Sequence, residues 1–557
     1  MERQYTDGKA HNKIVEALGR EDRLREHHED PESWARGYVD ELNRTASAEP
    51  KHLTASWNPQ EEIPFGRQVL FNGGYLFLQK IYNELSLPYA CRKIQKEARA
   101  KYNLDSILSS LIYGRLLQPA SKRATILHSS EKLLESRHLE LHDVYRALSM
   151  LADKTDWLQA FLYRQSQKLV KRSDRILYYD VTNFYWETGE EDEFRKYGHS
   201  KENRPNPIVQ MGLFMDASGL PLAFSLWPGN TSEQVTLKPL EEKIIENYGL
   251  EKFVTCTDAG LSSKGNRIFN TKGERAFVTT QSLKTMKREL QDWVFSPQGW
   301  HKDGDQSGRI WDLEGARNTG DRNAVFYKER WIKDGQFEQR LIVTFSRKYM
   351  EYQRRIREGQ ICRAQKLIEK NPSRLKTKGV NDCRRFIEKT AVTTEGEIAS
   401  IQLYGLNDAR IAEEEKYDGF YGVCTNLDDD ISAIIRISKG RWEIEEAFRI
   451  MKNELEARPV FLSRQDRIEA HFLVCYVAFL ILRLLERRLM DNGFRNFSLP
   501  EIVETLRSIQ YGKTQDIYLP MFQRTALTQA LSHSFGLPVH QEAYGRSQMR
   551  NLIAKTR

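Results

Sequence analysis

The sequence predicts an α/β protein in which a mainly helical N-terminal region precedes a mixed β-sheet. Apolar residues recur at spacings of three and four between about 65 and 173, which is the period of amphipathic helices. At Arg175 the pattern changes to short runs rich in β-branched and aromatic residues, which are typical of strands. The length of 557 residues allows about two to four domains, and 29% charged with 40% hydrophobic residues is ordinary for a soluble globular protein.

Changes in composition and periodicity divide the chain into six expected segments. The boundaries fall where helical periodicity gives way to strands, and where strands give way to a less regular, basic region. The segments are a small N-terminal element with a hairpin and a charged helix (1–55), a helical domain (56–173), the first part of a sheet core (174–283), a β-rich insertion with a basic stretch (284–418), the second part of the core (419–490) and a C-terminal helical region (491–557).

Two aspartates lie on strands of the expected core. "RILYYDVTNFYWE" places Asp180 in the first strand, and "EKFVTCTDAG" places Asp258 at the end of the fourth. The predicted order is strand, strand, strand, helix, strand, which brings the first and fourth strands side by side. Two carboxylates on neighbouring strand ends supply the oxygen ligands that Mg²⁺ prefers. Each aspartate taken alone is more typical of a cap or a turn.

The stretch "GRWEIEEAFRIMKNELEARPVF" predicts one charged helix. At about 100° per residue, Arg441, Glu445 and Lys452 share a face beside a buried apolar stripe. Glu445 is therefore the acid best placed to complete a site with the two aspartates. A surface ion pair between Arg441 and Glu445, stabilising by about 0.3 to 0.5 kcal/mol, explains the same spacing, and for the helix alone it is the better explanation. The stripe comprises Ile444, Ala447, Phe448, Met451 and Leu455.

Two basic segments stand out against a net charge of +8. Residues 347–378 carry eleven Lys or Arg against three Glu, so this stretch alone accounts for the net charge. In "RLLQPASKRATILH", Arg115, Lys122 and Arg123 surround a loop broken by Pro119. Both segments fit contacts to a phosphate backbone, and both fit an ordinary solvated surface.

Cysteine spacing and apolar runs argue against several classes of protein. The six cysteines include no CxxC pair, so neither a zinc site nor a disulfide framework is indicated. The N-terminus is charged from its second residue and lacks the apolar core of a signal peptide, which favours a cytoplasmic protein. The eleven apolar residues from 472 to 482 are fewer than the about twenty needed to span a bilayer, so a buried core helix is expected.

Together these segments resemble the bacterial insertion-sequence transposases of the DDE type. The third catalytic block of that family reads Tyr, two residues, Arg, three residues, Glu, six residues, Lys, and Arg441, Glu445 and Lys452 keep the last two intervals. Ser438 stands where the family has a phosphate-contacting tyrosine, so that contact is lost here or replaced by Lys439. "YYDVTNFYWE" and "TDAGLSS" resemble the two aspartate blocks.

The resemblance, over roughly residues 60 to 490, implies an RNase H-like catalytic core with a β-rich insertion. Asp180, Asp258 and Glu445 would bind two Mg²⁺ or Mn²⁺ ions and catalyse cleavage at the ends of an insertion sequence, with strand transfer into target DNA by a cut-and-paste route. The implied partners are double-stranded DNA, as terminal inverted repeats and as target, and a second copy of the chain in a synaptic complex, with no membrane. The residues implied to bind DNA are Arg441, Lys452, Lys439 and Ser438.

The resemblance also suggests roles for the flanking segments. The helical domain and the basic stretch are expected to contact DNA, the C-terminal region to support dimerisation, and the protein to be cytoplasmic and nucleoid-associated when bound to DNA. Three other functions fit parts of the sequence: a nuclease of the same fold without strand transfer, an inactive DNA-binding protein descended from a transposase, and a structural scaffold.

Overall fold

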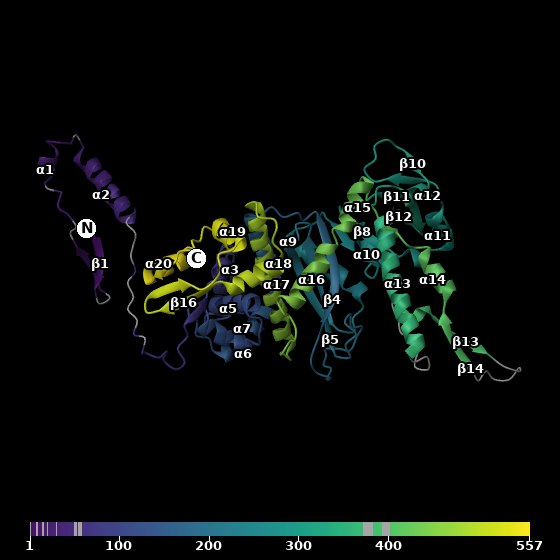
Figure 1. Cartoon of the computed structure of the whole chain (residues 1–557), viewed down its shortest axis with the longest axis horizontal. Helices are drawn as coiled ribbons and strands as arrows, with labels where there is room; N and C mark the ends of the chain where they lie inside the picture. The colour runs from purple at the N-terminus through teal and green to yellow at the C-terminus, as the bar shows by residue number, and fades with distance from the viewer. Residues whose placement is uncertain are drawn as a thin grey trace.

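The computed structural model describes residues 2–6, 9–13, 16–18, 20–28, 30–48, 53, 58, 60–370, 382–392 and 401–557. A sheet-containing core lies between two ends of different composition (Figure 1). Helices of the N-terminal half pack with the C-terminal elements at one end, and the insertion forms the other. The N-terminal element consists of the antiparallel pair β1 (Glu2–Thr6) and β2 (Lys9–Lys13), followed by α1 (Glu21–Leu24) and α2 (Pro31–Ala48).

Five strands form an RNase H-like core in the order β6-β5-β4-β7-β8. The first three along the chain make an antiparallel meander, α9 (Leu237–Tyr248) makes the crossover, and β7 and β8 run parallel to β4. This order matches the one predicted from sequence, so the α/β fold class is confirmed. The strands are β4 (Ile176–Tyr185), β5 (Ile208–Asp216), β6 (Pro221–Pro228), β7 (Val254–Thr257) and β8 (Ala276–Gln281).

The insertion extends the same sheet to ten strands. β15 (Phe420–Thr425) pairs with β8 on one side and with β12 on the other, so backbone hydrogen bonds continue from the core into the insertion. The helices and strands of the insertion include α11 (Arg288–Phe295), β9 (Trp300–Lys302), β10 (Ile310–Trp311), α12 (Leu313–Arg317), β11 (Val325–Asp334), β12 (Phe337–Ser346), α13 (Arg347–Lys370), β13 (Ile387–Val392), β14 (Ile401–Leu406) and α14 (Asp408–Glu415). Helix α10 (Lys264–Phe269) joins β7 to β8.

Helix α13 carries most of the basic stretch, whose residues 371–378 lie outside the described part of the chain. Its positive charge is partly neutralised within the protein. The buried Arg357 side chain meets the buried Asp418 carboxylate at 2.6 Å and also pairs with Glu415 at 3.2 Å, and both acids lie outside the stretch. The stretch is therefore less basic in the folded protein than its composition indicates.

Helix α17 (Gln465–Asp491) is the apolar helix at which the N-terminal and C-terminal parts meet the core. It packs against α3, α5 and α7 and against β6 (Figure 1). By length and composition it could span a membrane, but 94% of its most apolar 18-residue window is buried within the protein, as expected for a core helix. The helices around it are α3 (Tyr75–Glu84), α4 (Leu87–Glu97), α5 (Leu104–Leu117), α6 (Lys122–Glu131), α7 (Leu141–Ala152), α8 (Thr155–Leu169), α18 (Leu499–Ser508) and α19 (Ala526–Phe535).

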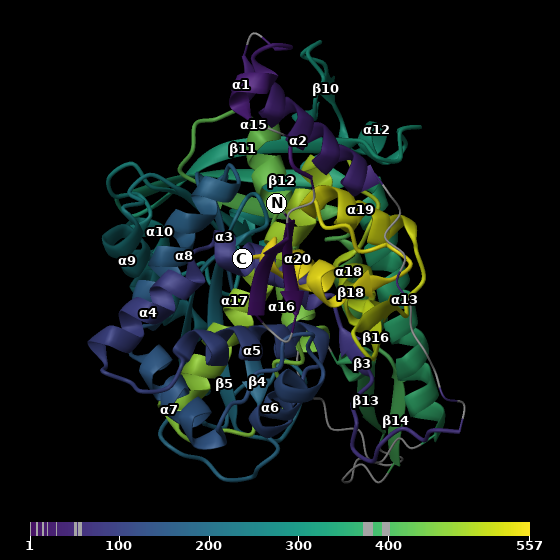
Figure 2. The same ribbon diagram turned by 90° about the vertical axis from the view of Figure 1, so that its left-hand side faces the viewer.

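The C-terminal region, predicted to be helical, also contains strands. β16, β17 and β18 join β3 of the N-terminal half in a four-stranded sheet, and Figure 2 shows these yellow elements beside the blue helices. Strands of two to five residues are too short to show a clear alternation in the sequence, which is why the pattern missed them. The elements are β3 (Leu70–Asn72), β16 (Gln510–Thr514), β17 (Ile517–Pro520), β18 (Tyr544–Gly545) and the last helix, α20 (Arg546–Ala554).

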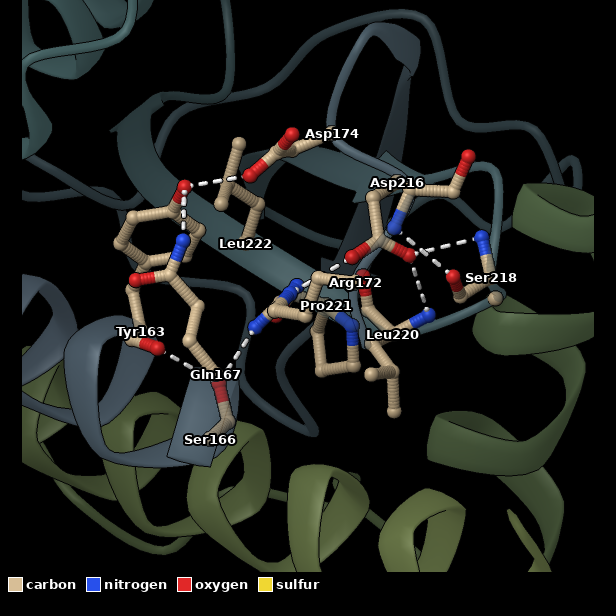
Figure 3. A network of polar contacts seen from close by, with 12 residues as sticks. Tyr163, Ser166, Gln167, Arg172, Asp174, Asp216, Ser218, Leu220, Pro221 and Leu222 are labelled. Atoms are coloured by element: carbon tan, nitrogen blue, oxygen red, sulfur yellow. Dashed lines mark hydrogen bonds and ion pairs between the residues drawn. The ribbon is translucent and has the colours of Figure 1, made fainter. Parts of the chain in front are cut away.

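A buried ion pair fastens the end of the helical domain to the core sheet (Figure 3). Arg172 Nε donates to Asp216 Oδ2 at 2.6 Å, and the two side chains are only 1% and 0% exposed. Arg172 also donates to Ser166 Oγ in α8 and to the carbonyl of Pro221, both at 2.9 Å, while Asp216 accepts from the backbone N–H of Leu220 at 3.1 Å. These extra hydrogen bonds offset the cost of burying both charges.

Replacing Asp216 with Ala should therefore destabilise the protein by about 3 to 5 kcal/mol, because Arg172 would remain buried without its counterion. Urea-induced unfolding followed by tryptophan fluorescence measures this loss. The matched control is Asp156→Ala, which removes a half-exposed pair with Lys243 at 3.1 Å and should change stability by less than about 1 kcal/mol. Equal losses for the two variants would contradict the anchoring role.

Candidate active site

The parallel pairing of β4 with β7 brings the two predicted aspartates together. Tyr178 lies opposite Cys256 in this pair. Two residues further along, Asp180 in β4 comes beside Asp258, which follows β7 directly. Burial is the main cause that raises the pKa of Asp180 to about 6; Lys201 opposes this rise and Asp258 adds to it. The two carboxylates therefore repel each other electrostatically.

Three basic side chains surround Asp180. Lys201 donates to the backbone carbonyl of Val181 and pairs with Glu233 at 3.3 Å. Burial and the charge of Lys201 lower the pKa of Lys452 to about 8, while Asp180 raises it. Arg441 is the third: burial lowers its pKa, but its anionic neighbours, including both aspartates, leave it raised overall. Sequence reasoning missed Lys201, which lies in the loop between β4 and β5.

The helix predicted to carry the third acid is α16 (Trp442–Asn453). It is shorter than expected, so Glu454 and Glu456 lie beyond its end. Its predicted apolar stripe, the five residues given above, is buried. Lys452 reaches toward the core and pairs with Glu202 at 3.2 Å. The phase of the helix was thus predicted correctly, and only its length was not.

Glu445 is 60% exposed and pairs with Arg441 at 3.4 Å. This is the surface ion pair that, for the helix taken alone, is the better explanation of the spacing. Within the residues that the structure describes, no group of three or more His, Cys, Asp or Glu side chains is placed to hold a metal ion. The structure therefore brings Asp180 and Asp258 together, and it leaves Glu445 turned to its neighbour on the helix.

Ser438 and Lys439 line a cavity of about 530 Å³ beside Arg441. Tyr421 also lines it, with its hydroxyl 2.6 Å from Thr280 Oγ1, and it is among the neighbours whose proximity raises the pKa of Arg441. A tyrosine on β15 is therefore close to Arg441, although position 438 holds a serine. No signal within the third block itself could have indicated this residue, because Tyr421 belongs to the preceding strand.

The fold and this acidic pair define the class of the protein: an RNase H-like enzyme core with aspartates on its first and fourth strands. Residues 171–481, more than half of the chain, match the family model described as "Transposase DDE domain". The chain belongs to this family, whose members are nucleases and transesterification enzymes that generally use divalent metal ions. The catalytic roles of the named residues remain predictions.

Two further comparisons were made. A search of the curated proteins gave no significant match. Among solved structures, the chain is similar to the piggyBac transposase in its synaptic complex with hairpin DNA, at 8% sequence identity and a TM-score of 0.38, covering 88% of each chain. A likeness this distant carries no argument about function, so the assignment depends on the family match.

The two aspartates fit a divalent cation. Carboxylate oxygens are the ligands that Mg²⁺ and Mn²⁺ prefer, and a cation would counter the burial and the repulsion by Asp258 that raise the pKa of Asp180. The structure therefore places two carboxylates together, while Glu445 is paired with Arg441 at the start of α16.

Asp180→Asn should raise the Tm of the metal-free protein at pH 8, because it removes a carboxylate that burial and Asp258 disfavour. The gain should shrink progressively as the pH falls from about 6 toward about 4, the ordinary pKa of an aspartate in the unfolded chain, because protonation of the folded carboxyl gradually removes the cost of its ionised form. Thermal unfolding in EDTA across this pH range measures the difference. Added Mg²⁺ should raise the Tm of the wild type but not of the variant. A variant less stable than the wild type at pH 8 would show that burial and Asp258 do not disfavour the ionised Asp180 carboxylate.

Proposed function

We propose that this protein is a DNA transposase that cuts the ends of an insertion sequence and joins them to target DNA. The observation that carries the proposal is the pairing of Asp180 with Asp258 on β4 and β7, inside the region that matches the transposase DDE domain. Double-stranded DNA is the proposed substrate. A homodimer holding both ends of the element in the cytoplasm is the proposed assembly.

Asp180 and Asp258 would hold the metal ions, Mg²⁺ or Mn²⁺. A bound divalent ion lowers the pKa of water and neutralises charge on phosphate oxygens, which is the chemistry that in-line attack on a phosphodiester needs. The same positive charge would keep Asp180 ionised, against the burial that raises its pKa in the free protein. Attack by water cuts the DNA, and attack by a freed 3′-hydroxyl joins it, so one site serves both reactions.

Glu445 is the proposed third acid. In the free protein its carboxylate pairs with Arg441, so it must change conformation to join the two aspartates. The pair is half-exposed, so it contributes little stability and breaks at small cost. A DNA phosphate offers Arg441 a stronger, charge-assisted partner. Once Arg441 binds that phosphate, Glu445 is free to rotate toward the two aspartates. Substrate binding would in this way complete the site.

The basic groups around Asp180 would hold the phosphates of the DNA strand. Lys452 has a pKa of about 8 in the free protein, and an arriving phosphate would keep it fully protonated. Lys439 and Ser438 line the neighbouring cavity together with Tyr421. The Tyr421 hydroxyl is our candidate for the phosphate contact that a serine at 438 does not provide.

Asp258→Ala should reduce end cleavage by about 10³-fold or more, while DNA binding persists, because the carboxylate serves the chemistry and not the docking. The substrate is a duplex taken from the DNA that flanks the coding region, cleaved in Mg²⁺ or Mn²⁺ and analysed on a gel. A second duplex with a preformed 3′-hydroxyl end and a target plasmid tests joining. Cleavage without joined products would indicate a nuclease, and unchanged cleavage by the variant would refute the site.

Glu445→Gln should reduce cleavage by a similar factor and change stability by no more than about 0.5 kcal/mol, since it only weakens an exposed i,i+4 pair. The control is Glu446→Gln on the same helix, whose carboxylate pairs with Arg449 at 3.1 Å and has no proposed role in chemistry. Comparable activity in both variants would show that Glu445 is an ordinary surface charge.

A further inference from the structure

Apart from the cavity beside Arg441, a cavity lined by basic side chains lies between the start of α6 and the segment that follows α16. Its volume is about 190 Å³. Arg115, Lys122 and Arg123 contribute three basic side chains to its lining, and none of the lining residues is acidic. The others are Ala120, Ser121, Leu141, Tyr145, Pro459, Val460, Phe461, Leu462 and His471.

Lys122 is only 7% exposed and has a neutral partner. Its Nζ lies 3.1 Å from His471 Nδ1, and His471 Nε2 lies 2.9 Å from the carbonyl of Ala457. Because that carbonyl requires the proton on Nε2, Nδ1 accepts a hydrogen bond from the lysine. Burial is the main cause that lowers the pKa of Lys122 to about 7, and Arg115 lowers it further. In the described part of the chain, no carboxylate pairs with this ammonium group.

Arg115 adds a second cation that is 6% exposed. Its two terminal nitrogens donate to backbone carbonyls, among them those of Leu455 at 3.2 Å and Glu456 at 3.0 Å. Its Nε is buried and has no hydrogen-bond partner among the residues described. Two buried cations that share a cavity and lack an anion are electrostatically costly, and a bound anion would relieve that cost.

The start of α6 favours an anion at the same place. The helix is ten residues long, and Ser121 caps it by accepting from the backbone N–H of Ala124 at 3.2 Å. The first turn carries Lys122 and the exposed Arg123. Free N–H groups and the helix dipole at an N-terminus attract negative charge, and here they act together with the buried lysine.

One wall of the cavity belongs to the chain segment that follows the basic groups of the active site. The segment after α16 begins just beyond Lys452 and includes Arg458. Lys452 and Arg458 both pair with Glu202. The same segment then forms one wall of the cavity, where the carbonyl of Leu462 accepts from Trp186 Nε1, just after β4, at 3.1 Å. A DNA strand leaving the active site along this segment would reach the cavity.

We propose that this cavity binds one backbone phosphate of the DNA, held by Lys122 and Arg123 at the start of α6. The proposal rests on the proposed action on DNA and adds a contact outside the catalytic site. It assigns a binding role to the basic loop of the helical domain, which sequence alone left open between a phosphate contact and a surface turn. Because a phosphate contact reads no base, it should strengthen binding to all sequences alike.

The test compares the full-length wild type with Lys122→Met in EDTA, using a fluorescent duplex of arbitrary sequence and fluorescence anisotropy at several salt concentrations. Losing one phosphate contact should reduce the slope of log K against log salt by about 0.9 and weaken binding at 0.1 M salt by about three- to tenfold. Arg123→Gln, at an exposed position, should have a similar effect. The control is Lys132→Met, an exposed lysine at the other end of α6 that donates to Gln68, and it should leave the slope unchanged.

Thermal unfolding of the same proteins separates binding from structure. Lys122→Met should keep or raise the Tm, because it removes a buried charge. An unchanged slope in both Lys122→Met and Arg123→Gln overturns the proposal, as does weaker binding that is explained by a lowered Tm. Inorganic phosphate alone is the second probe: if it stabilises the wild type while the DNA slope is unaffected by the variants, the cavity takes free phosphate and not DNA. These measurements involve no cleavage, so a failure of the proposed catalysis is observed separately.

Discussion

The parallel pairing of β4 with β7 is the constraint on which the site depends. It joins residues about eighty positions apart in the chain and places Asp180, in the middle of β4, beside Asp258, which directly follows β7. The meander β4-β5-β6 and the crossover helix α9 connect the two strands along the chain, and the crossover returns the chain to the side of β4 opposite β5. A change of one residue in its register would turn one carboxylate to the opposite face of the sheet and separate the pair.

The charged groups around this pairing suit two ligands of opposite charge, a cation and an anion. Asp180 has a raised pKa and Lys452 a lowered one, so the acid and the base are each less easily ionised than in water. A divalent cation would stabilise the first and a phosphate the second. The buried pair Arg172–Asp216 shows the opposite arrangement, because each charge already has its partner and is surrounded by further hydrogen bonds.

Sequence reasoning was most successful where local periodicity and chain order determine the structure. The order of the core strands, the adjacency of the two aspartates and the buried stripe of α16 all follow from such patterns. It was less successful where distant segments decide the outcome: the pairing of β15 with β12 of the insertion, the strands β16 to β18 completed by β3, and the position of Lys201. The orientation of the Glu445 side chain depends on the charged groups around it, and spacing along a helix does not reveal these groups.

The shared sheet has a mechanical consequence for the insertion. Because β15 is hydrogen-bonded to both β8 and β12, the insertion is joined to the catalytic core by a continuous ladder and not by a flexible linker at that point. Ladders of this kind bend little, so a force applied to the insertion would be transmitted through the backbone to the strands that bear the aspartates. The insertion would then act as a rigid arm, and the span between any contact on it and the reacting phosphate would be fixed by strand spacing.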